Sequence, residues 1–444
     1  MREDLIQKIK EAGVVGAGGA GFPTHIKVAS NAQTVIVNGA ECEPLLRVDQ
    51  QLMDVKADKI VQGLEIVMEI TGASEGIIAL KSKYKNAIAS LEKEIVGKNI
   101  LIKILDDFYP AGDEQLTVYE STGRLVPQGG IPLKVNCVVD NVETLLNVVE
   151  AVNDKPVTHT YLTINGEVNR PLTLKLPIGT PIIKALEISG YRDLENMKVI
   201  EGGPMMGKMV EDLNQPITKT TKGLIVLSQD HPLIRKRTLP PEKIMRQARV
   251  SCVQCRYCTD LCPRYLLGHK IEPHKIMRMV KNLQGQEETM KMAFACSECG
   301  VCEQYACIMG LSPRSVNAMI KRELSKLGIK PCAPPSDQTV NPMREHRKIP
   351  VKRLISRLGL NQYDQNAPLS EEDYPINHVA IRLRQNVGAP SKPIVKVGQK
   401  VKKGDLIAVI PDKAFGANLH ASINGVIQDI TDSIIISSIE GSDK

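Results

Sequence analysis

The sequence predicts a multidomain α/β protein, and three observations lead to this fold class. The first third of the 444-residue chain alternates strand-like and helix-like segments, which is typical of a parallel sheet covered by helices. Residues 240–328 look helical and hold eight of the eleven cysteines. Residues 371–444 form short apolar runs separated by glycine turns, which predicts a small all-β module.

The first domain is placed at residues 1–155 and is expected to hold a Rossmann-like parallel sheet. Apolar residues follow strand and helix periods in turn, and Gly72 and Gly97 suit the ends of the two helices. The predicted strands are 34–38, 76–80 and 100–105, and the predicted helices are 52–67 and 83–96. An order of strand, helix, strand, helix, strand indicates parallel pairing.

A second module is placed at residues 156–235, where the pattern changes. The run YLTINGEVNRPLTLKLPIG holds two alternating segments with Asn165–Gly166 between them, a pair that favours a two-residue hairpin turn. A short helix at 181–189 and further strands up to Leu227 are expected to follow. Together they predict a compact α+β module.

Two cysteine runs in the helical part, 236–330, carry the most specific chemical signal. Each run begins with three cysteines at three-residue spacing, and the first ends in Cys-Pro, as in bacterial two-cluster ferredoxins. In those proteins the fourth cysteine of each run ligates the other cluster. The resulting ligand sets are Cys252, Cys255, Cys258 and Cys307 for one [4Fe–4S] cluster, and Cys296, Cys299, Cys302 and Cys262 for the other. A pair of zinc sites fits two runs of four less well, because zinc usually takes two separated pairs of ligands.

A linker and a final module complete the predicted organisation. Residues 331–370 begin with a proline-rich stretch, PCAPPSDQTVNPMREHRKIP, that has no helix or strand period and predicts a linker. Residues 371–444 form the all-β module.

Composition excludes several function classes. Aromatic residues make up 3% of the chain and Trp is absent, so an aromatic platform for nucleic-acid bases is not expected. No apolar run approaches the ~20 residues that cross a bilayer, and the N-terminus MREDLIQKIKEAG is unlike a secretory signal. A cytoplasmic protein is therefore expected, in which cysteines serve metal or redox chemistry instead of disulfides. The net charge of +7 lies largely in short basic runs, which are either solvated segments or contacts for an acidic partner.

The stretch GAGGAGFPTHIK, residues 16–27, matches the G-x-G-x-x-G dinucleotide fingerprint, and Glu41 and Glu43 lie about twenty residues further on, where an acid would bind ribose. That fingerprint must follow a strand and open a helix. Here a helical segment precedes the glycines and the first strand begins only at Thr34. The order therefore argues against a Rossmann NAD loop.

Four separated stretches carry a resemblance to a known family: GAGGAGFPTHIK, VNGAECEP at 37–44, YPAGDEQL at 109–116 and VDNVETL at 139–145. With the cysteine runs, the chain resembles the flavin-binding subunit family of NADH–quinone oxidoreductases. This family includes the NADH-oxidising subunit of respiratory complex I, the RnfC protein of Rnf electron-transport complexes, and the cobalamin reductases of propanediol-utilisation microcompartments.

The resemblance implies FMN as a bound cofactor and NADH as the electron donor. Glycines let backbone amides approach a flavin phosphate closely, and Lys27 supplies positive charge. The implied cofactor-binding residues are Gly16, Gly18, Gly19, Lys27, Asn38, Glu41, Gly112, Asp113, Glu114, Asn141 and Thr144. Taken one at a time, the acids and amides among them are equally typical of helix caps and solvated faces.

The resemblance also implies the nature of two other parts. Residues 156–235 correspond to the family's β-grasp soluble-ligand-binding (SLBB) module, expected as a structural spacer, with a corrinoid contact as the alternative. Residues 371–444 resemble a barrel-sandwich hybrid of the lipoyl type. The segment NLHASING, where a carrier has its lysine, contains none, so swinging-arm chemistry is not expected.

The implied function is NADH-dependent electron transfer through FMN and two clusters to an acceptor, with no side chain as a catalytic acid or base. Ala40 and Asp140 differ from complex I and place the chain nearer the Rnf and cobalamin-reductase branch. The C-terminal barrel-sandwich module favours cobalamin, or a corrinoid-handling protein, as acceptor inside a bacterial microcompartment, with shell proteins as partners. The alternatives are an Rnf-like subunit that passes electrons between proteins, and an electron carrier without nicotinamide binding.

Overall fold

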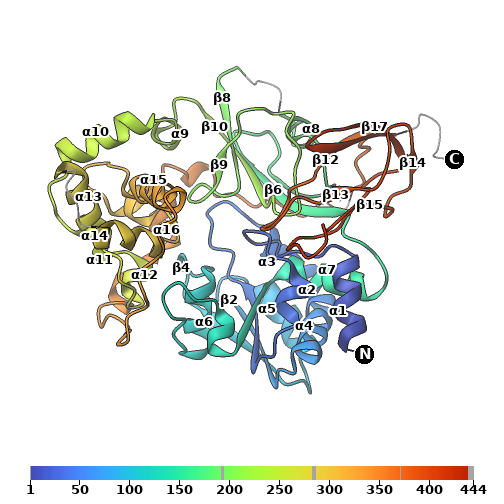
Figure 1. Ribbon diagram of the computed structural model, residues 1–444, viewed down its shortest axis with the longest axis horizontal. Coiled ribbons are helices and arrows are strands. Elements are labelled where there is room, and N and C mark those ends of the chain that lie inside the picture. The colour runs from blue at the N-terminus through green and yellow to red at the C-terminus, as the bar shows by residue number, and fades with distance from the viewer. Residues whose placement is uncertain (1, 192–194, 283–286, 371, 439–444) are drawn as a thin grey trace.

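The computed structural model describes residues 2–191, 195–282, 287–370 and 372–438. Figure 1 shows an α/β domain in blue and teal, with the β-grasp part in green above it, the helical part in yellow and orange to one side, and the C-terminal β part in red to the other. None of the helices in the described part of the chain combines the length and the apolar character needed to span a bilayer.

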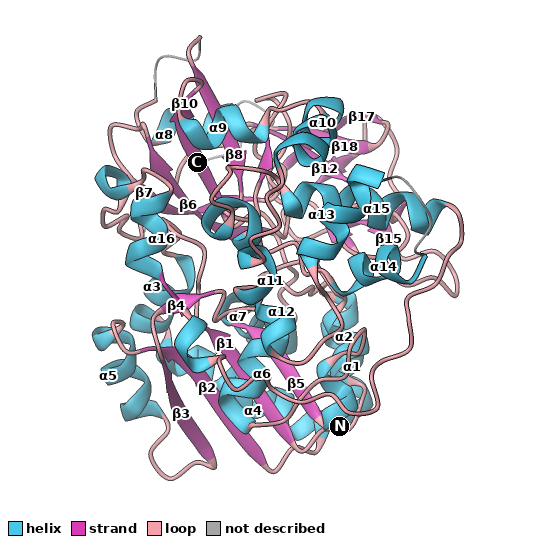
Figure 2. Cartoon of the chain, turned by 90° about the vertical axis from the view of Figure 1, so that its left-hand side faces the viewer, coloured by secondary structure: helices cyan, strands magenta, loops and turns pink. Residues whose placement is uncertain are grey.

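The first domain is built on a four-stranded parallel sheet in the order β3-β2-β1-β5, which confirms the predicted sheet (Figure 2). The strands are β1 (Thr34–Gly39), β2 (Glu75–Lys81), β3 (Ile100–Leu105) and β5 (Cys137–Asn141). The helices are α1 (Arg2–Glu11), α2 (Thr24–Val28), α3 (Val48–Val55), α4 (Ala57–Thr71), α5 (Lys85–Glu94), α6 (Glu114–Thr122) and α7 (Val142–Val152). The predicted helix 52–67 is instead the pair α3 and α4, because the chain turns out of helical geometry at Lys56.

Alternation along β1 explains how both faces of this sheet are covered. Val35 and Val37 belong to the apolar core under α1, α4 and α7, whereas Ile36 belongs to the core on the other face, under α6. Strand order reverses beside β1, since β2 lies on one side and β5 on the other. In open α/β sheets, ligands bind at the carboxyl ends of the strands at such a reversal.

The β-grasp part contains a five-stranded sheet in the order β7-β6-β10-β8-β9. Its strands are β6 (His159–Gly166), β7 (Leu172–Pro177), β8 (Met197–Glu201), β9 (Lys208–Met209) and β10 (Gly223–Ser228), and α8 (Ile182–Ile188) follows β7. The predicted hairpin of β6 and β7 is present, but Asn165–Gly166 is not its turn. Asn165 is buried, donates to the carbonyl of Leu45 at 3.2 Å, and pairs within β6 to β10, so the connection is made by residues 167–171.

The helical part holds the cysteine runs on short helices. These are α9 (Pro232–Arg237), α10 (Pro241–Ser251), α11 (Tyr257–Asp260), α12 (Pro263–Leu266), α13 (Pro273–Asn282), α14 (Glu287–Lys291) and α15 (Pro313–Lys326), with the irregular turns Met292–Ala295 and Val301–Ala306. Helices α10, α13 and α15 share one apolar core.

The predicted linker at 331–370 is ordered in its second half. Strand β11 (Ile349–Pro350) pairs antiparallel with β4 (Phe108–Tyr109) of the first domain, and α16 (Val351–Arg357) packs in an apolar cluster with Tyr109 and Cys299. This segment therefore ties the helical part to the α/β domain. The exact domain boundaries stay predictions.

The C-terminal part consists of two small sheets, β12-β18-β17-β14 and β13-β15-β16, around one apolar core. Its strands are β12 (His378–Arg382), β13 (Lys392–Pro393), β14 (Lys400–Val401), β15 (Leu406–Val409), β16 (Leu419–His420), β17 (Gly425–Ile430) and β18 (Ser433–Ser437). The predicted boundary residue 371 and the end of the module, 439–444, lie outside the described residues.

Candidate functional site

The glycine-rich stretch forms a closed loop at the crevice between β1 and β5. The N–H of Gly16 donates to the carbonyl of Phe22 at 2.9 Å, and Val15 pairs with Pro23. Helix α1 precedes the loop and β1 follows it, as the sequence indicated, so the loop does not join a strand to a helix as a Rossmann fingerprint does.

The loop lies against the start of α7. The N–H of Ala17 donates to Oγ1 of Thr144 at 3.0 Å, and a Cβ built on Gly18 would lie 3.0 Å from Cβ of Asn141. Asn141 caps α7 by accepting from the N–H of Glu143 at 3.0 Å. The first and fourth predicted blocks are therefore in direct contact.

Gly19 marks the open side of the loop. A Cβ built there meets no described atom within 4 Å. Gly21, by contrast, has a positive φ of 70° and a Cβ position only 3.0 Å from Thr220 and Asn386, which belong to the β-grasp and C-terminal parts. The loop is thus supported on one side and free on the other.

Lys27 is engaged with protein atoms instead of projecting freely into the crevice. Its Nζ donates to the carbonyl of Val139 at 2.6 Å and to Oδ1 of Asp140 at 3.2 Å, and lies 4.0 Å from Glu114. Burial lowers the pKa of Lys27, but Asp140 and Glu114 outweigh it and the net shift is upward. Lys27 therefore stays charged beside two acids.

The second and third predicted blocks fold onto each other. Nδ2 of Asn38 donates to the carbonyl of Gly112 at 2.8 Å, and Oδ1 accepts from the N–H of Ala40 at 3.3 Å. A Cβ on Gly112 would lie 3.2 Å from Sγ of Cys42, so only glycine allows this approach without displacement of the thiol.

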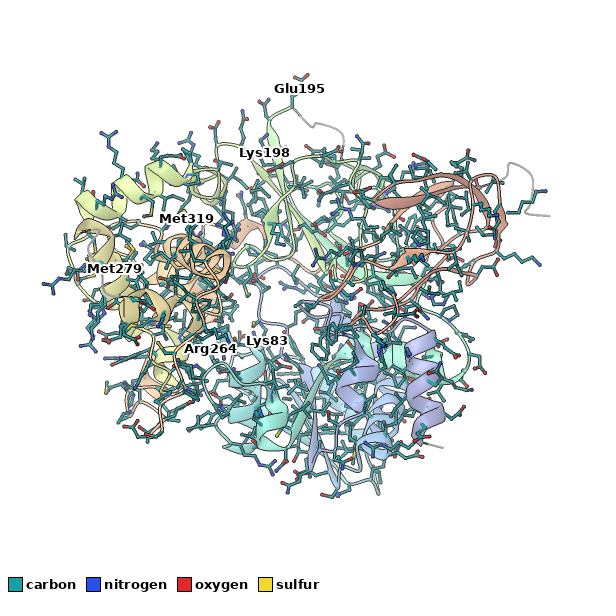
Figure 3. The ribbon with its side chains drawn as sticks, viewed as in Figure 1. Lys83, Glu195, Lys198, Arg264, Met279 and Met319 are labelled. Atoms are coloured by element: carbon teal, nitrogen blue, oxygen red, sulfur yellow. The ribbon has the colours of Figure 1, made fainter. Side chains whose placement is uncertain are left out.

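The predicted ligand Asp113 holds structure together. Its Oδ1 accepts from the N–H groups of Gln115 and Leu116 at the start of α6, at 3.1 and 3.3 Å. Its Oδ2 accepts from Arg264 of the helical part at 2.7 Å. Figure 3 shows Arg264 at the junction between the helical part and the first domain. Glu114 is half-exposed beside Lys27, and burial raises its pKa.

Glu41 belongs to a buried group of acids and one lysine that sequence reasoning only partly found. Its Oε1 accepts from the N–H of Val48 at 3.0 Å, and burial, with repulsion from Asp49, raises its pKa to about 8. Asp49 accepts from Nδ2 of Asn141 at 2.8 Å. Lys222 of the β-grasp part bonds to Glu143, and burial lowers its pKa to about 8. Asp49 and Lys222 carry no sequence signal, because only the tertiary fold brings them here.

This crevice fits a flavin nucleotide on two observations. The Cβ position of Gly19 opens into unfilled space. Three buried carboxylate oxygens nearby, Oε2 of Glu41, Oδ1 of Asp49 and Oδ2 of Asp140, have no hydrogen-bond partner among the described residues. Ribityl and ribose hydroxyls are donors that carboxylates accept.

The two cysteine sets occupy different depths. Cys252, Cys255, Cys258 and Cys307 line one small cavity, and Cys255 is exposed. We call these four the outer set. The thiol of Cys302 instead interacts electrostatically with Cys296, Cys299 and Cys262, and these four, which we call the inner set, are buried or nearly so.

The donor chemistry of both sets fits iron–sulfur clusters. Burial raises the pKa of Cys258 and of Cys262 to about 12, so these thiols are protonated at neutral pH until metal displaces the proton. Among the described residues, no three His, Cys, Asp or Glu gather tightly enough around one point for a single metal ion.

Tyr109 connects the crevice with the inner set. It lies on β4, three residues before Gly112, and its hydroxyl donates to the carbonyl of Cys299 at 2.7 Å. Tyr109 is buried, and the ion pair of Asp113 with Arg264 makes a second connection two residues after Cys262. The inner set is thus the one next to the crevice.

Glu43 joins the second block to the β-grasp part. It is wholly buried, and its two oxygens accept from the N–H groups of Met205 and Met206, each at 2.8 Å. A Cβ on Gly203 would lie 2.2 Å from Glu43, so the two segments touch. The sequence offered no signal for this role beyond the spacing of Glu43 from the glycines.

Replacing Glu43 with alanine is expected to destabilise this junction by about 3 kcal/mol or more, because two charge-assisted hydrogen bonds of ~1.5–3 kcal/mol are lost. Glu43→Gln keeps one acceptor oxygen and should lose about half as much. The thermal unfolding midpoint measures both, with the exposed Glu92→Ala as control. An unchanged midpoint in Glu43→Ala contradicts this role.

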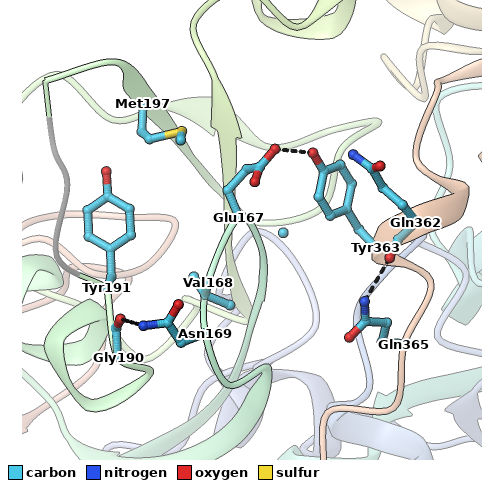
Figure 4. Close-up of a pocket in the computed structure, with 10 residues that line it drawn as sticks. Glu167, Val168, Asn169, Gly190, Tyr191, Met197, Gln362, Tyr363 and Gln365 are labelled. Carbon is cyan, nitrogen blue, oxygen red and sulfur yellow. Dashed lines mark hydrogen bonds between the residues drawn. The ribbon is translucent and has the colours of Figure 1, made fainter.

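A cavity of about 510 Å³ lies apart from these residues, between the β-grasp part and residues 362–365 (Figure 4). Tyr191 and Tyr363 stand on opposite sides of it, and Tyr363 donates to Glu167. No predicted site residue lines this cavity.

Four family models match the chain in order, in agreement with the predicted fold class. They are the Nuo51 FMN-binding domain at residues 9–150, the SLBB domain at 161–208, the 4Fe-4S dicluster domain at 251–312 and the RnfC barrel sandwich hybrid domain at 361–441.

Similar proteins span most of the chain. Cobalamin reductase PduS of Citrobacter freundii is 46% identical over 437 residues, which cover 98% of this chain and 96% of that protein. The protein of the same name from Salmonella typhimurium is 45% identical over the same shares. The RnfC-type component of the Na(+)-translocating ferredoxin:NAD(+) oxidoreductase complex of Acetobacterium woodii is 35% identical over 276 residues, 60% of this chain and 59% of that protein.

A solved structure shares the fold. An NAD+-reducing [NiFe]-hydrogenase in the H2-reduced state superposes with a TM-score of 0.51 at 21% identity, over 75% of this chain and 64% of that one.

Proposed function

The chain belongs to the cobalamin reductase PduS family, and we propose that it carries electrons from NADH through FMN and two [4Fe–4S] clusters to a corrinoid. The observation that carries the proposal is the contact of Tyr109 with Cys299, which joins the flavin-type crevice to the inner cysteine set.

The crevice residues would hold the flavin by the glycine loop and the carboxylates beneath it. Backbone amides of the loop suit the phosphate, and the unpaired oxygens of Glu41, Asp49 and Asp140 suit hydroxyl groups. FMN, when bound, supplies the conversion of a hydride into two single electrons. Lys27, held by Asp140, keeps a positive charge near the site and so favours binding of an anionic cofactor.

The cysteine sets give the electrons a direction. The inner set lies next to the crevice through Tyr109 and Arg264, and the outer set includes the exposed Cys255. The spacing of the runs supports the exchange of Cys262 and Cys307 between the sets. We infer the order crevice, inner set, outer set, acceptor.

The test is an anaerobic assay of the purified, iron-reconstituted chain with NADH and hydroxocobalamin. Corrinoid reduction by the isolated chain, dependent on FMN, is the expected result. If NADH oxidation occurs only with artificial dyes, the chain instead passes electrons between proteins as part of a larger complex. If the bound flavin stays oxidised with NADH, NADH is not the donor.

A role within a larger complex is the second candidate, and the match to the RnfC barrel sandwich hybrid domain is the observation that favours it. The resemblance to propanediol-utilisation reductases also leads us to propose a microcompartment location with shell proteins as neighbours. Helix α1 is a poor candidate for a free targeting segment, because Leu5, Ile6 and Ile9 pack into the core of the first domain.

A further inference from the structure

An exposed apolar patch surrounds the outer cysteine set. It is formed by five residues next to the set in sequence, each between 45 and 80% exposed: Val250, Val253, Tyr257, Ile308 and Met309. They are five of the seventeen large apolar side chains exposed in the described part of the chain. Scattered exposed apolar residues need no explanation, but a gathered group marks an interaction surface.

The patch is continuous with the cavity of the outer set. Val253 and Met309 line that cavity together with Cys252, Cys258 and Cys307. A partner seated on the patch would therefore lie directly against the thiols that we assign to the outer cluster. The inner set is more enclosed, since Cys262, Cys299 and Cys302 are buried.

Basic side chains border the patch. Residues 241–258 carry four bases and one acid, Glu242. Lys243, Arg246 and Arg249 are exposed on α10, and none of them forms an ion pair with another described residue. The patch thus combines an apolar centre with an uncompensated positive rim.

We propose that this patch docks a protein electron acceptor whose redox group is surrounded by acidic side chains. The apolar centre excludes water at the point of contact, and opposite charges at the rim steer the encounter and fix its orientation. A second copy of this chain is disfavoured by its net charge of +7. A free corrinoid, with neutral amide side chains, would make no use of a basic rim.

This inference rests on the proposed electron path and names its last step. One NADH yields NAD+, one proton and two electrons, and each electron leaves the outer cluster singly. One NADH therefore reduces two one-electron acceptors, and no bond forms or breaks at the docking surface.

The test uses the complete, reconstituted protein with two probes, a flavodoxin with an acidic face and a cytochrome c with a basic face. With NADH, the rate of flavodoxin reduction to its semiquinone is expected to fall about tenfold or more from low to high salt. The rate with cytochrome c should not fall. Equal salt dependence with both probes would overturn the proposal.

Variants separate the apolar and the charged contributions. Val250→Ser with Ile308→Ser, and separately Arg246→Glu with Arg249→Glu, should each weaken flavodoxin binding and reduction about tenfold. Binding is measured by sedimentation of the unreduced proteins. The matched controls in the C-terminal part, Val397→Ser and Lys402→Glu, should change neither. Cluster EPR spectra and hydroxocobalamin reduction should stay as in the unmodified chain.

Three results overturn the inference. They are unchanged flavodoxin binding in the variants, an equal loss of hydroxocobalamin reduction, which would make the free corrinoid the occupant, and self-association that the variants abolish. If the unmodified chain reduces flavodoxin but not hydroxocobalamin, the proposed function fails while the docking surface stands.

Discussion

Replacing Cys307 with alanine is expected to remove the cluster of the first cysteine run, although Cys307 belongs to the second. In the structure Cys307 lines one cavity with Cys252, Cys255 and Cys258, and the thiol of Cys258 interacts electrostatically with all three. About half of the iron, one of two EPR signals and all electron delivery to the acceptor should be lost.

The comparison of variants makes this result specific. Cys307→Ala should give the same EPR spectrum as Cys258→Ala, and Cys262→Ala the same as Cys302→Ala. The matched control is Cys332→Ala, whose thiol donates to Glu288 at 3.2 Å away from both sets, and which should keep both clusters. A Cys307→Ala spectrum that matches Cys302→Ala would contradict the exchange of ligands.

Replacing Gly19 with valine is expected to abolish FMN binding while leaving the apoprotein as stable as before, within about 0.5 kcal/mol. A Cβ at Gly19 meets no described atom within 4 Å, so a side chain there is tolerated until a ligand needs the space. FMN retention after gel filtration and the thermal midpoint of the apoprotein measure the two effects.

Gly18→Val provides the matched comparison one residue away. Its Cβ would press on Asn141 at 3.0 Å, and Asn141 holds both the start of α7 and Asp49. This variant should therefore destabilise the apoprotein as well as lose FMN, by about 1–3 kcal/mol. Retention of FMN in Gly19→Val would show that the cofactor does not use the open side of the loop.

The parallel sheet and the four-part organisation could be predicted because each depends on local patterns. Strands β1, β2 and β3 lie at most one residue from their predicted ends. The turn at Asn165–Gly166 could not, since its hairpin preference is overridden by pairing of Gly166 with Val226 of β10 and by the bond of Asn165 to Leu45. Local turn chemistry loses when a neighbouring strand needs the same residues.

The candidate site was predicted in outline and missed in its supports. The quoted blocks meet at one crevice, but Lys27 and Asp113 are already paired, with Asp140 and Arg264 respectively. Asp49 and Lys222 are brought in by α3 and by the β-grasp part, and Tyr109 gains its role only from the position of Cys299. Such residues have no spacing signal, because the contacts join segments far apart in the chain.

The central claim is that electrons pass in series from the crevice to the inner set and then to the outer set. Rapid-freeze EPR of the Cys262→Ala protein after mixing with NADH tests it most directly. The serial path predicts that the flavin is reduced while the outer cluster stays oxidised on the timescale on which the unmodified chain reduces it. Reduction of the outer cluster at the unmodified rate would contradict the path.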